Sequence, residues 1–123
     1  MKYSQLTGEI LRAAIEVHTT LGPGLLENAY RLCLRHELAL GGFSVETECA
    51  VPIIYKGIRI DVGYRTDLLV EKLVVIECKA TPTTLPIHRA QILSQMRLGN
   101  YPVGLLINFH MELLRDGIQR FVI

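Results

Sequence analysis

Two acidic residues and a lysine follow apolar segments in a pattern that suits metal-assisted hydrolysis. Glu77 and Lys79 follow the apolar run Leu73–Ile76 and are two positions apart, so on a strand their side chains share one face. Asp67 ends the polar face of the preceding segment. Two carboxylates would hold Mg²⁺ or Mn²⁺, and the lysine would orient or deprotonate a water and offset charge on a phosphate. The alternative is an exposed strand end whose charges form a weak surface pair.

The register between the two strands decides whether the acids meet. A two-residue turn at Glu71-Lys72 pairs Asp67 with Ile76, and Asp67 and Glu77 then point to opposite sides of the sheet. A shared site therefore requires a three-residue loop, or a bulge near Asp67. The apolar pattern leaves both registers open, because both strands are apolar on both faces here.

Two helices come first among the elements that would position these residues. Apolar residues recur at helical spacing over residues 5–20, and Gly22-Pro23-Gly24 ends that segment. A second helix is predicted over residues 25–40, ending at Gly41-Gly42, so the two would form a helical hairpin. The residues expected on or near the apolar face of the second helix are Leu26, Ala29, Tyr30, Cys33, Leu34 and Leu38.

Three strands should follow the helices. Residues 43–51 alternate as a half-buried strand, with Pro52 near its end. After a turn at residues 55–57, one strand is predicted to run from Ile58 to Val70. Its apolar face is expected to hold Ile58, Ile60, Val62 and Tyr64. The continuous apolar run before Glu77 is typical of a central strand.

A crossover helix then joins two central strands. The helix is predicted from Pro86 to about Leu98, and the strand from Val103 to Phe109, which implies a parallel, right-handed connection. The residues that recur at helical spacing along it, and so define the predicted stripe, are Ile87, Ala90, Gln91, Leu93, Ser94 and Leu98. Residues 111–114 and 118–122 flank Arg115-Asp116-Gly117, which predicts a C-terminal hairpin. The order is ααβββαβ plus that hairpin, an α/β (α+β) fold with a mixed sheet flanked by helices.

Composition bounds the class of protein. The chain has 123 residues, half of them hydrophobic, which predicts a single domain over 1–123 and excludes disorder. The formal net charge of +1 excludes nucleic-acid binding by bulk positive charge alone, although it leaves room for a localised basic surface. The three cysteines form no metal-binding spacing, and we expect buried free thiols in a reducing cytoplasm, with the Cys78 side chain in the core. No signal peptide or membrane span is predicted.

The chemistry-bearing residues resemble a known superfamily. Asp67, then Glu77-Cys78-Lys79, then a helix carrying Gln91, resembles the PD-(D/E)XK nuclease superfamily, and the element order is similar to its restriction-endonuclease-like core. The segment Gly24–Tyr30 matches the GxxExxY motif that names a small family within that superfamily. Segments 88–93 and 104–109 also resemble that family, so the resemblance covers about residues 5 to 122.

This resemblance implies a role for each matching residue. The metal ligands would be Glu27, Asp67, Glu77 and the backbone carbonyl of Cys78, and Lys79 would be the catalytic lysine. Gln91 corresponds to a glutamine that supports the site from a downstream helix. Several branches show QxxxY there, but the fifth position here is Gln95, which either substitutes as a polar contact or marks an altered site.

Two further residues have open alternatives. Tyr30 lies one turn after Glu27 and would hydrogen-bond a site carboxylate or the substrate, unless it packs in the core. Arg65 lies two residues before Asp67, and it would bind phosphate or a site acid, unless it pairs with Asp61.

The leading hypothesis is a nuclease that depends on Mg²⁺ or Mn²⁺, a hydrolase acting on nucleic acid, with DNA as the favoured substrate. The alternative is a non-catalytic nucleic-acid- or protein-binding module that retains the nuclease fold. A homodimer is also expected, because the mean hydropathy of +0.30 is compatible with a buried dimer face, and nucleases that cut both strands often act as symmetric pairs.

Overall fold

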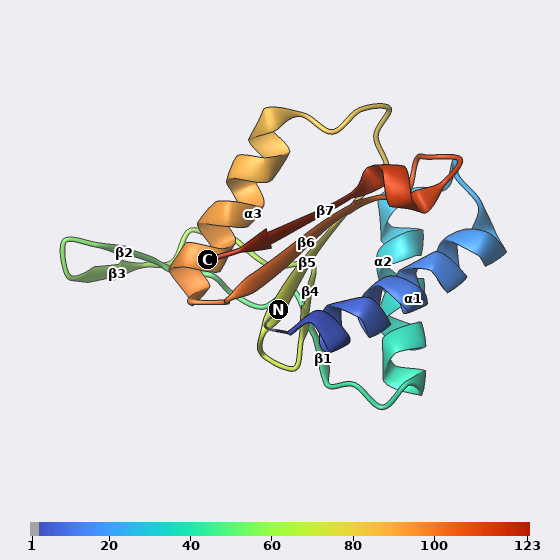
Figure 1. The fold of residues 1–123 in the computed structure, drawn as a ribbon. Coiled ribbons are helices and arrows are strands. Elements are labelled where there is room, and N and C mark those ends of the chain that lie inside the picture. The colour runs from blue at the N-terminus through green and yellow to red at the C-terminus, as the bar shows by residue number, and fades with distance from the viewer. Residues whose placement is uncertain (1–2) are drawn as a thin grey trace.

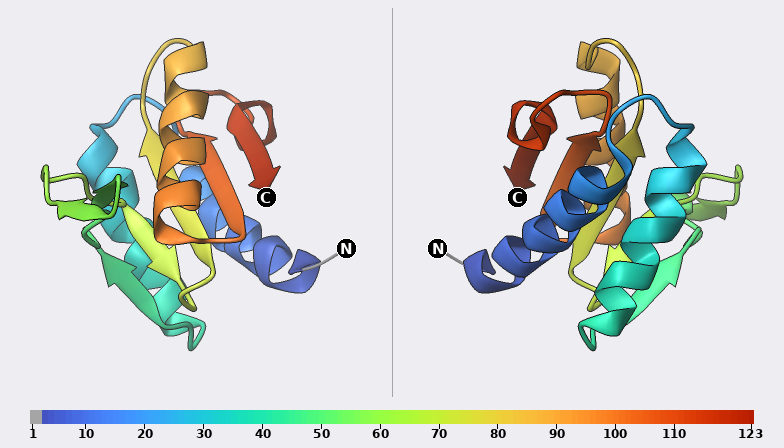
Figure 2. Two further views of the ribbon diagram at one scale, coloured as in Figure 1. Left: turned by 90° about the vertical axis from the view of Figure 1, so that its left-hand side faces the viewer. Right: turned by 90° about the vertical axis from the view of Figure 1, so that its right-hand side faces the viewer.

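The computed structural model describes residues 3–123 and has a five-stranded mixed sheet with helices on both faces (Figure 1). The strands lie in the order β1-β4-β5-β6-β7, and a separate hairpin, β2-β3, extends from one side. Helices α1 and α2 cover one face and α3 covers the other, as the two opposite views of Figure 2 show. This arrangement confirms the predicted α/β class with a mixed, helix-flanked sheet. No helix in residues 3–123 is long and apolar enough to cross a membrane.

The first two helices are present nearly as predicted. They are α1 (Ser4–Leu21) and α2 (Glu27–Leu40). Gly22 ends α1 with φ 70°, a conformation that favours glycine, and its N–H donates to the His18 carbonyl. The buried stripe of α2 is formed by Tyr30, Leu34 and Leu38.

The prediction was wrong for two residues near this stripe. Leu26 is 83% exposed, and Cys33 is also exposed. Helical spacing of four residues from Tyr30 to Leu38 defines the buried stripe, and Cys33 lies one position off it. Only Cys78 of the three cysteines is fully buried, so the expectation of three buried thiols was also wrong.

The central crossover unit is confirmed. Strands β5 (Val74–Lys79) and β6 (Val103–Asn108) pair in parallel, and α3 (Pro86–Gly99) joins them. Both strands are buried on both faces until β5 reaches Lys79. Polar side chains at the end of β5 therefore emerge directly from the core.

The buried side of α3 differs from the predicted stripe. Its buried residues are Ile92 and Met96, whereas Ile87 and Leu98 of the predicted stripe are 57% and 37% exposed. A Cβ atom at Gly104 of β6 would collide with the Met96 side chain, so this glycine lets α3 approach the sheet along Ile92 and Met96. Of the predicted stripe, Leu93 packs against the buried cluster on this face, whereas Ile87 and Leu98 stay in contact with solvent.

The segment predicted as one strand from 58 to 70 is two separate strands. β3 (Ile58–Ile60) pairs with β2 (Ile53–Tyr55) in the projecting hairpin, and β4 (Leu68–Val70) belongs to the main sheet. Gly63, with φ 82°, lies in the irregular segment between β3 and β4. The four residues of the expected apolar face are exposed rather than half-buried: Ile58 by 65%, Ile60 by 39%, Val62 by 50% and Tyr64 by 55%.

The two ends of the sheet also depart from prediction. The strand predicted over 43–51 is reduced to β1 (Val45–Thr47), because Glu48 adopts φ 52°. At the other end, the 3₁₀ helix η1 (Leu114–Gly117) leads into β7 (Ile118–Val122), which pairs with β6 and not with residues 111–114. The predicted C-terminal hairpin was therefore wrong. A Cβ atom at Gly117 would collide with the Asn108 carbonyl, so the chain passes close to the end of β6 at this point.

Candidate active site

A three-residue turn at residues 71–73 brings Asp67 and Glu77 together. Leu68 pairs with Ile76 across β4 and β5, so the next step of the same register places Asp67 opposite Glu77. The Asp67 N–H donates to Glu77 Oε1 (3.4 Å), and the Cys78 N–H donates to Asp67 Oδ2 (2.9 Å). This is the register that a shared site requires. Glu77 is only 7% exposed, so the alternative of an exposed strand end is wrong.

Burial makes these acids difficult to ionise without a cation nearby. Removal from water and, to a smaller extent, the neighbouring Asp67 raise the pKa of Glu77 to about 7, and Gln95 and Lys79 oppose this rise. Burial also raises the pKa of Asp67, against the Cys78 N–H and the Lys79 charge. A positive charge between the two carboxylates would relieve their repulsion.

Glu27 approaches the same site from α2. Burial raises the pKa of Glu27. The charge of Lys79 lowers this pKa, and the charge of Asp67 raises it. Glu27 is the first residue of α2, where the positive end of the helix dipole favours a carboxylate. The site therefore combines acids from a helix N-terminus and from two adjacent strands.

Tyr30 lies in the core and fixes the loop before α2. Its ring is fully buried and stacks on Phe109 with centroids 4.5 Å apart. Its hydroxyl donates to the Gly22 carbonyl and accepts from the Leu25 N–H (3.1 Å). Of the alternatives for Tyr30, the structure shows core packing, and the hydroxyl contacts the backbone of the loop. Tyr30 thereby ties down the segment that leads into Glu27.

The glutamine that contacts Glu77 is Gln95. Its side chain hydrogen-bonds to Glu77 and lowers the pKa of that residue. Gln91, one turn earlier on α3, is exposed and lines a groove beside the site. Gln95, which stands where the QxxxY pattern has tyrosine, therefore makes a polar contact with Glu77.

Lys79 and Cys78 complete the end of β5. The Lys79 charge lowers the pKa of Asp67, Glu77 and Glu27 alike, so its ammonium acts on all three acids. The Cys78 thiol is buried in the core on the other face, as predicted. The Lys79 carbonyl accepts from the Phe109 N–H, toward β6, so the alternating backbone of β5 directs the Cys78 N–H and carbonyl toward Asp67.

The described contacts of Arg65 do not include the acids. It is exposed, and its guanidinium donates to the Tyr64 carbonyl (3.0 Å). Asp61 pairs with Arg59 instead (3.3 Å). Neither of the pairings considered for Arg65, with a site acid or with Asp61, is therefore among the described contacts.

Asn108 supports the site and was missed from the sequence. It is fully buried at the end of β6, opposite Lys79. Its Oδ1 accepts from the N–H groups of Thr81 (3.2 Å) and His110 (3.1 Å), and its Nδ2 donates to the Thr81 carbonyl (2.9 Å). These bonds fix the chain directly after Lys79. A polar residue within the apolar run 103–109 was the signal that could have revealed it.

The donor set fits a hard divalent cation. Asp67 and Glu77 supply adjacent carboxylates whose ionisation is impeded by burial, the Cys78 carbonyl is directed toward Asp67, and all three offer oxygen atoms of the kind that such a cation binds. Within residues 3–123, however, no three His, Cys, Asp or Glu side chains lie close enough to form a ready-made metal cluster. The third acid, Glu27, is within electrostatic range rather than part of a closed cage.

The fold and the acid–lysine arrangement define the class of protein. A model of the PD-(D/E)XK nuclease superfamily matches residues 4–121, and the chain belongs to that superfamily. No curated protein and no solved structure matches the chain. The superfamily match supports a nuclease-type function, nucleic acid as the substrate and a divalent metal as the cofactor. It does not distinguish the GxxExxY family, which stays a prediction.

Proposed function

We propose that the protein is a nuclease that hydrolyses phosphodiester bonds with Mg²⁺ or Mn²⁺. The observation that carries the proposal is the pairing of Asp67 with Glu77 beside Lys79, in a chain of the nuclease superfamily. Asp67, Glu77 and the Cys78 carbonyl would hold the ion, with Glu27 as a further acidic ligand. Bound metal would supply a water of lowered pKa and neutralise charge on the phosphate.

The protein side chains would bind and orient the reacting groups. Lys79 orients the attacking water by hydrogen bonding, and its charge offsets the charge that develops on the phosphate. Gln95 and the Asp67 N–H hold the Glu77 carboxylate in one orientation. Tyr30 fixes the loop that places Glu27, and Asn108 fixes the chain after Lys79.

Two residues have proposed roles outside the carboxylate centre. The exposed Arg65 would bind a backbone phosphate of the substrate, and the exposed Gln91 would contact the substrate from α3. Both lie close in sequence to a residue of the site, Asp67 and Gln95 respectively, which would place such contacts next to the scissile bond.

A cleavage panel tests the proposed function. Purified protein is incubated with single-stranded and duplex DNA and RNA, with Mg²⁺ or with Mn²⁺, and compared with Lys79→Ala. We expect cleavage by the wild type, with DNA preferred, and its loss in the variant. Failure of the wild type to cleave any of these substrates, together with failure to bind either ion, would overturn the proposal.

The second candidate function is a binding module that retains the nuclease fold. The observation in its favour is that Glu77, with a pKa of about 7, is partly protonated at neutral pH when no cation is bound. Calorimetric titration with Mg²⁺ separates the two functions. A nuclease site requires Mg²⁺ affinity that falls in Asp67→Asn and Glu77→Gln, whereas a binding module has no affinity that depends on these residues.

Self-association and cellular location stay predictions. A homodimer would place two sites on the two strands of a duplex, and light scattering measures whether the chain forms one. A cytoplasmic location is expected from the sequence alone.

A further inference from the structure

A groove lies between α3 and the segment that carries the β2-β3 hairpin. Its volume is about 500 Å³, within the range of roughly 300–1,000 Å³ typical of small-ligand sites. One side of the groove is lined by Val51, Ile53 and Tyr64. The other side is lined by residues of α3, among them Ile87 and Leu98. The walls are thus apolar and include one aromatic residue, which is 55% exposed.

The groove adjoins the carboxylate site through α3. Gln95 lines the groove and also hydrogen-bonds to Glu77. Its Oε1 is buried and has no hydrogen-bond partner among the described residues, which leaves an acceptor to be satisfied. Gln91 adds a second amide to the lining. A ligand in this groove would therefore lie beside Glu77 and meet apolar walls, an aromatic ring and two amide groups.

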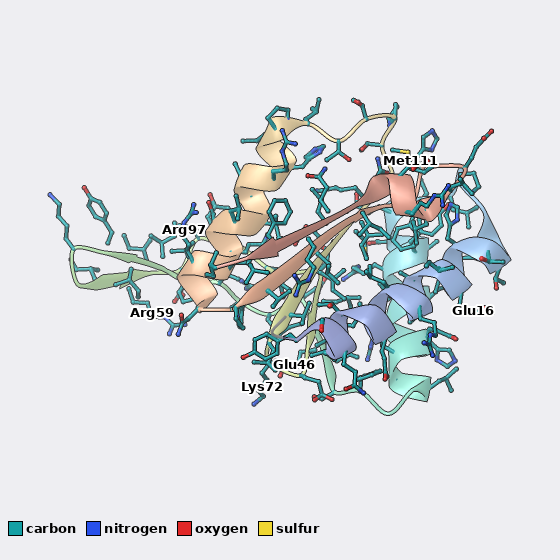
Figure 3. All side chains as sticks on the ribbon, in the orientation of Figure 1. Glu16, Glu46, Arg59, Lys72, Arg97 and Met111 are labelled. Carbon is teal, nitrogen blue, oxygen red and sulfur yellow. The ribbon has the colours of Figure 1, made fainter. Side chains whose placement is uncertain are left out.

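The charges of the flanking elements identify the kind of ligand. Residues 51–65 and 86–99 contain five of the 13 Lys and Arg residues and only one of the 12 Asp and Glu residues, a net charge of +4 against −3 for the rest of the chain. Figure 3 shows Arg59 of the hairpin and Arg97 of α3 on the same side of the molecule. A symmetric contact with a second copy would bring two such positive surfaces together, whereas a polyanion is attracted to one.

We propose that this groove binds an unstacked nucleobase of a single-stranded nucleic acid, next to the phosphate at the carboxylate site. The proposal rests on the nuclease function proposed above and specifies its substrate class. Tyr64 stacks on the base, the amides of Gln91 and Gln95 face its polar edge, and the basic flanks attract the phosphates. A base within a duplex is stacked and paired, so it cannot enter the groove without leaving the helix.

Binding without metal tests the proposal independently of cleavage. The probes are a fluorescent oligothymidylate of about 12 nucleotides, a length within the usual footprint of single-strand-binding sites, and a blunt duplex, both measured by anisotropy in EDTA. We expect the single strand to bind more tightly than the duplex. Tyr64→Ala should weaken single-strand binding by about 5- to 150-fold, the usual loss for one stacked base, and change duplex binding less than about twofold.

Two matched controls accompany this variant. Tyr55 is 59% exposed, close to the 55% of Tyr64, but it lies on the hairpin outside the groove lining, so Tyr55→Ala should leave single-strand binding unchanged. Ser94 lines the groove, so Ser94→Trp should fill it and weaken single-strand binding, whereas Ser94→Ala should not. Circular dichroism of each variant checks that the fold is intact.

Three results would overturn the groove proposal. They are equal losses in Tyr64→Ala and Tyr55→Ala, tighter binding of the duplex, and variants that change the molecular mass in light scattering but not the oligonucleotide affinity. The last result would assign the surface to a second copy. Cleavage with binding that does not depend on Tyr64 refutes the groove alone, whereas Tyr64-dependent binding without cleavage in Mg²⁺ or Mn²⁺ refutes the nuclease function alone.

Discussion

The two faces of the sheet differ in how completely helices cover them. On the side of α1 and α2, sixteen buried residues form one cluster that includes Ile76, Cys78 and Leu105. On the side of α3, the buried cluster has five residues, among them Val75 and Leu106. We call the first face sealed because its cluster residues are at most 5% exposed. The second face is covered along the Ile92–Met96 side of α3 and is open at the groove and the carboxylates, so we call it partly open.

This difference separates stability from chemistry on the same strand. Side chains alternate along β5, so Ile76 and Cys78 enter the sealed face while Glu77 and Lys79 reach the partly open one. An acid with a pKa of about 7 costs folding free energy at neutral pH, and the large cluster on the other face offsets that cost. We therefore expect substitutions on the two faces to affect different properties.

The largest expected effect is on the partly open face. Lys79→Ala should reduce cleavage by about 10²- to 10⁴-fold, the usual contribution of a group that assists proton transfer, because the ammonium that acts on all three acids is lost. Thermal unfolding should change little. Lys72→Ala, in the exposed turn, is the control and should cleave as the wild type does. Cleavage by Lys79→Ala within tenfold of the wild type would contradict this assignment.

A truncation on the sealed face should have the opposite profile. Leu105 is fully buried in the larger cluster, so Leu105→Ala should lower the free energy of unfolding by about 2–5 kcal/mol. Its cleavage rate, measured at low temperature where it remains folded, should stay near that of the wild type. The control is Leu26→Ala, at a residue 83% exposed, with an expected change within about 0.5 kcal/mol. Equal destabilisation of both variants would contradict the contrast between buried and exposed leucines.

The cost of Glu77 should depend on pH. The pKa of Glu77 is about 7 in the folded protein and near 4.5 in the unfolded chain, so the folded protein holds the proton more tightly. The contribution of the protonated side chain to the free energy of unfolding is complete below pH 4.5 and is lost as pH rises through 7. Glu77→Gln should therefore stabilise the metal-free protein at pH 8 by about 3 kcal/mol, and not at pH 4.5. Urea unfolding at the two pH values measures this. Glu9→Gln, at an exposed residue, is the control, and a gain that does not depend on pH would exclude ionisation as its cause.

The smallest expected effect concerns the link between the sealed face and the site. Tyr30→Phe keeps the stacking on Phe109 but removes the hydroxyl that bonds to Gly22 and Leu25. The free energy of unfolding should fall by about 1 kcal/mol, the typical net value of a lost hydrogen bond, and Mg²⁺ affinity should fall severalfold because Glu27 is less well held. Tyr55→Phe serves as control. Unchanged Mg²⁺ affinity in Tyr30→Phe would show that the loop does not position Glu27.

The sequence predicted the elements whose patterns are local. Helical spacing placed α1 and α2, and the continuous apolar runs placed β5 and β6, because these runs are buried on both faces. The acids and Lys79 were identified because charged side chains at the end of a buried apolar strand are unusual and indicate a functional site. The structure places Asp67 opposite Glu77, and their functional roles stay predictions.

The wrong predictions concern segments whose apolar pattern does not show which part of the protein packs against them. Most of the predicted α3 stripe lines the groove, because helical periodicity shows that two sides of a helix differ and not which side meets the sheet. The alternation after Ile58 belongs to a projecting hairpin rather than to a strand of the sheet. The contact of Gln95 with Glu77 depends on how α3 crosses β5, which no local pattern encodes.

The turn at residues 71–73 has a consequence for how this chain can vary. Glu71 and Lys72 adopt φ 53° and 55°, and the Leu73 N–H closes the turn on the Val70 carbonyl (3.0 Å). A deletion or insertion of one residue here would send Asp67 to the other side of the sheet while every side chain of the site stayed in the sequence. Selection for activity should therefore eliminate changes in the length of this turn, while residue type can vary among residues that accept a positive φ. The turn between β2 and β3 is free to lengthen.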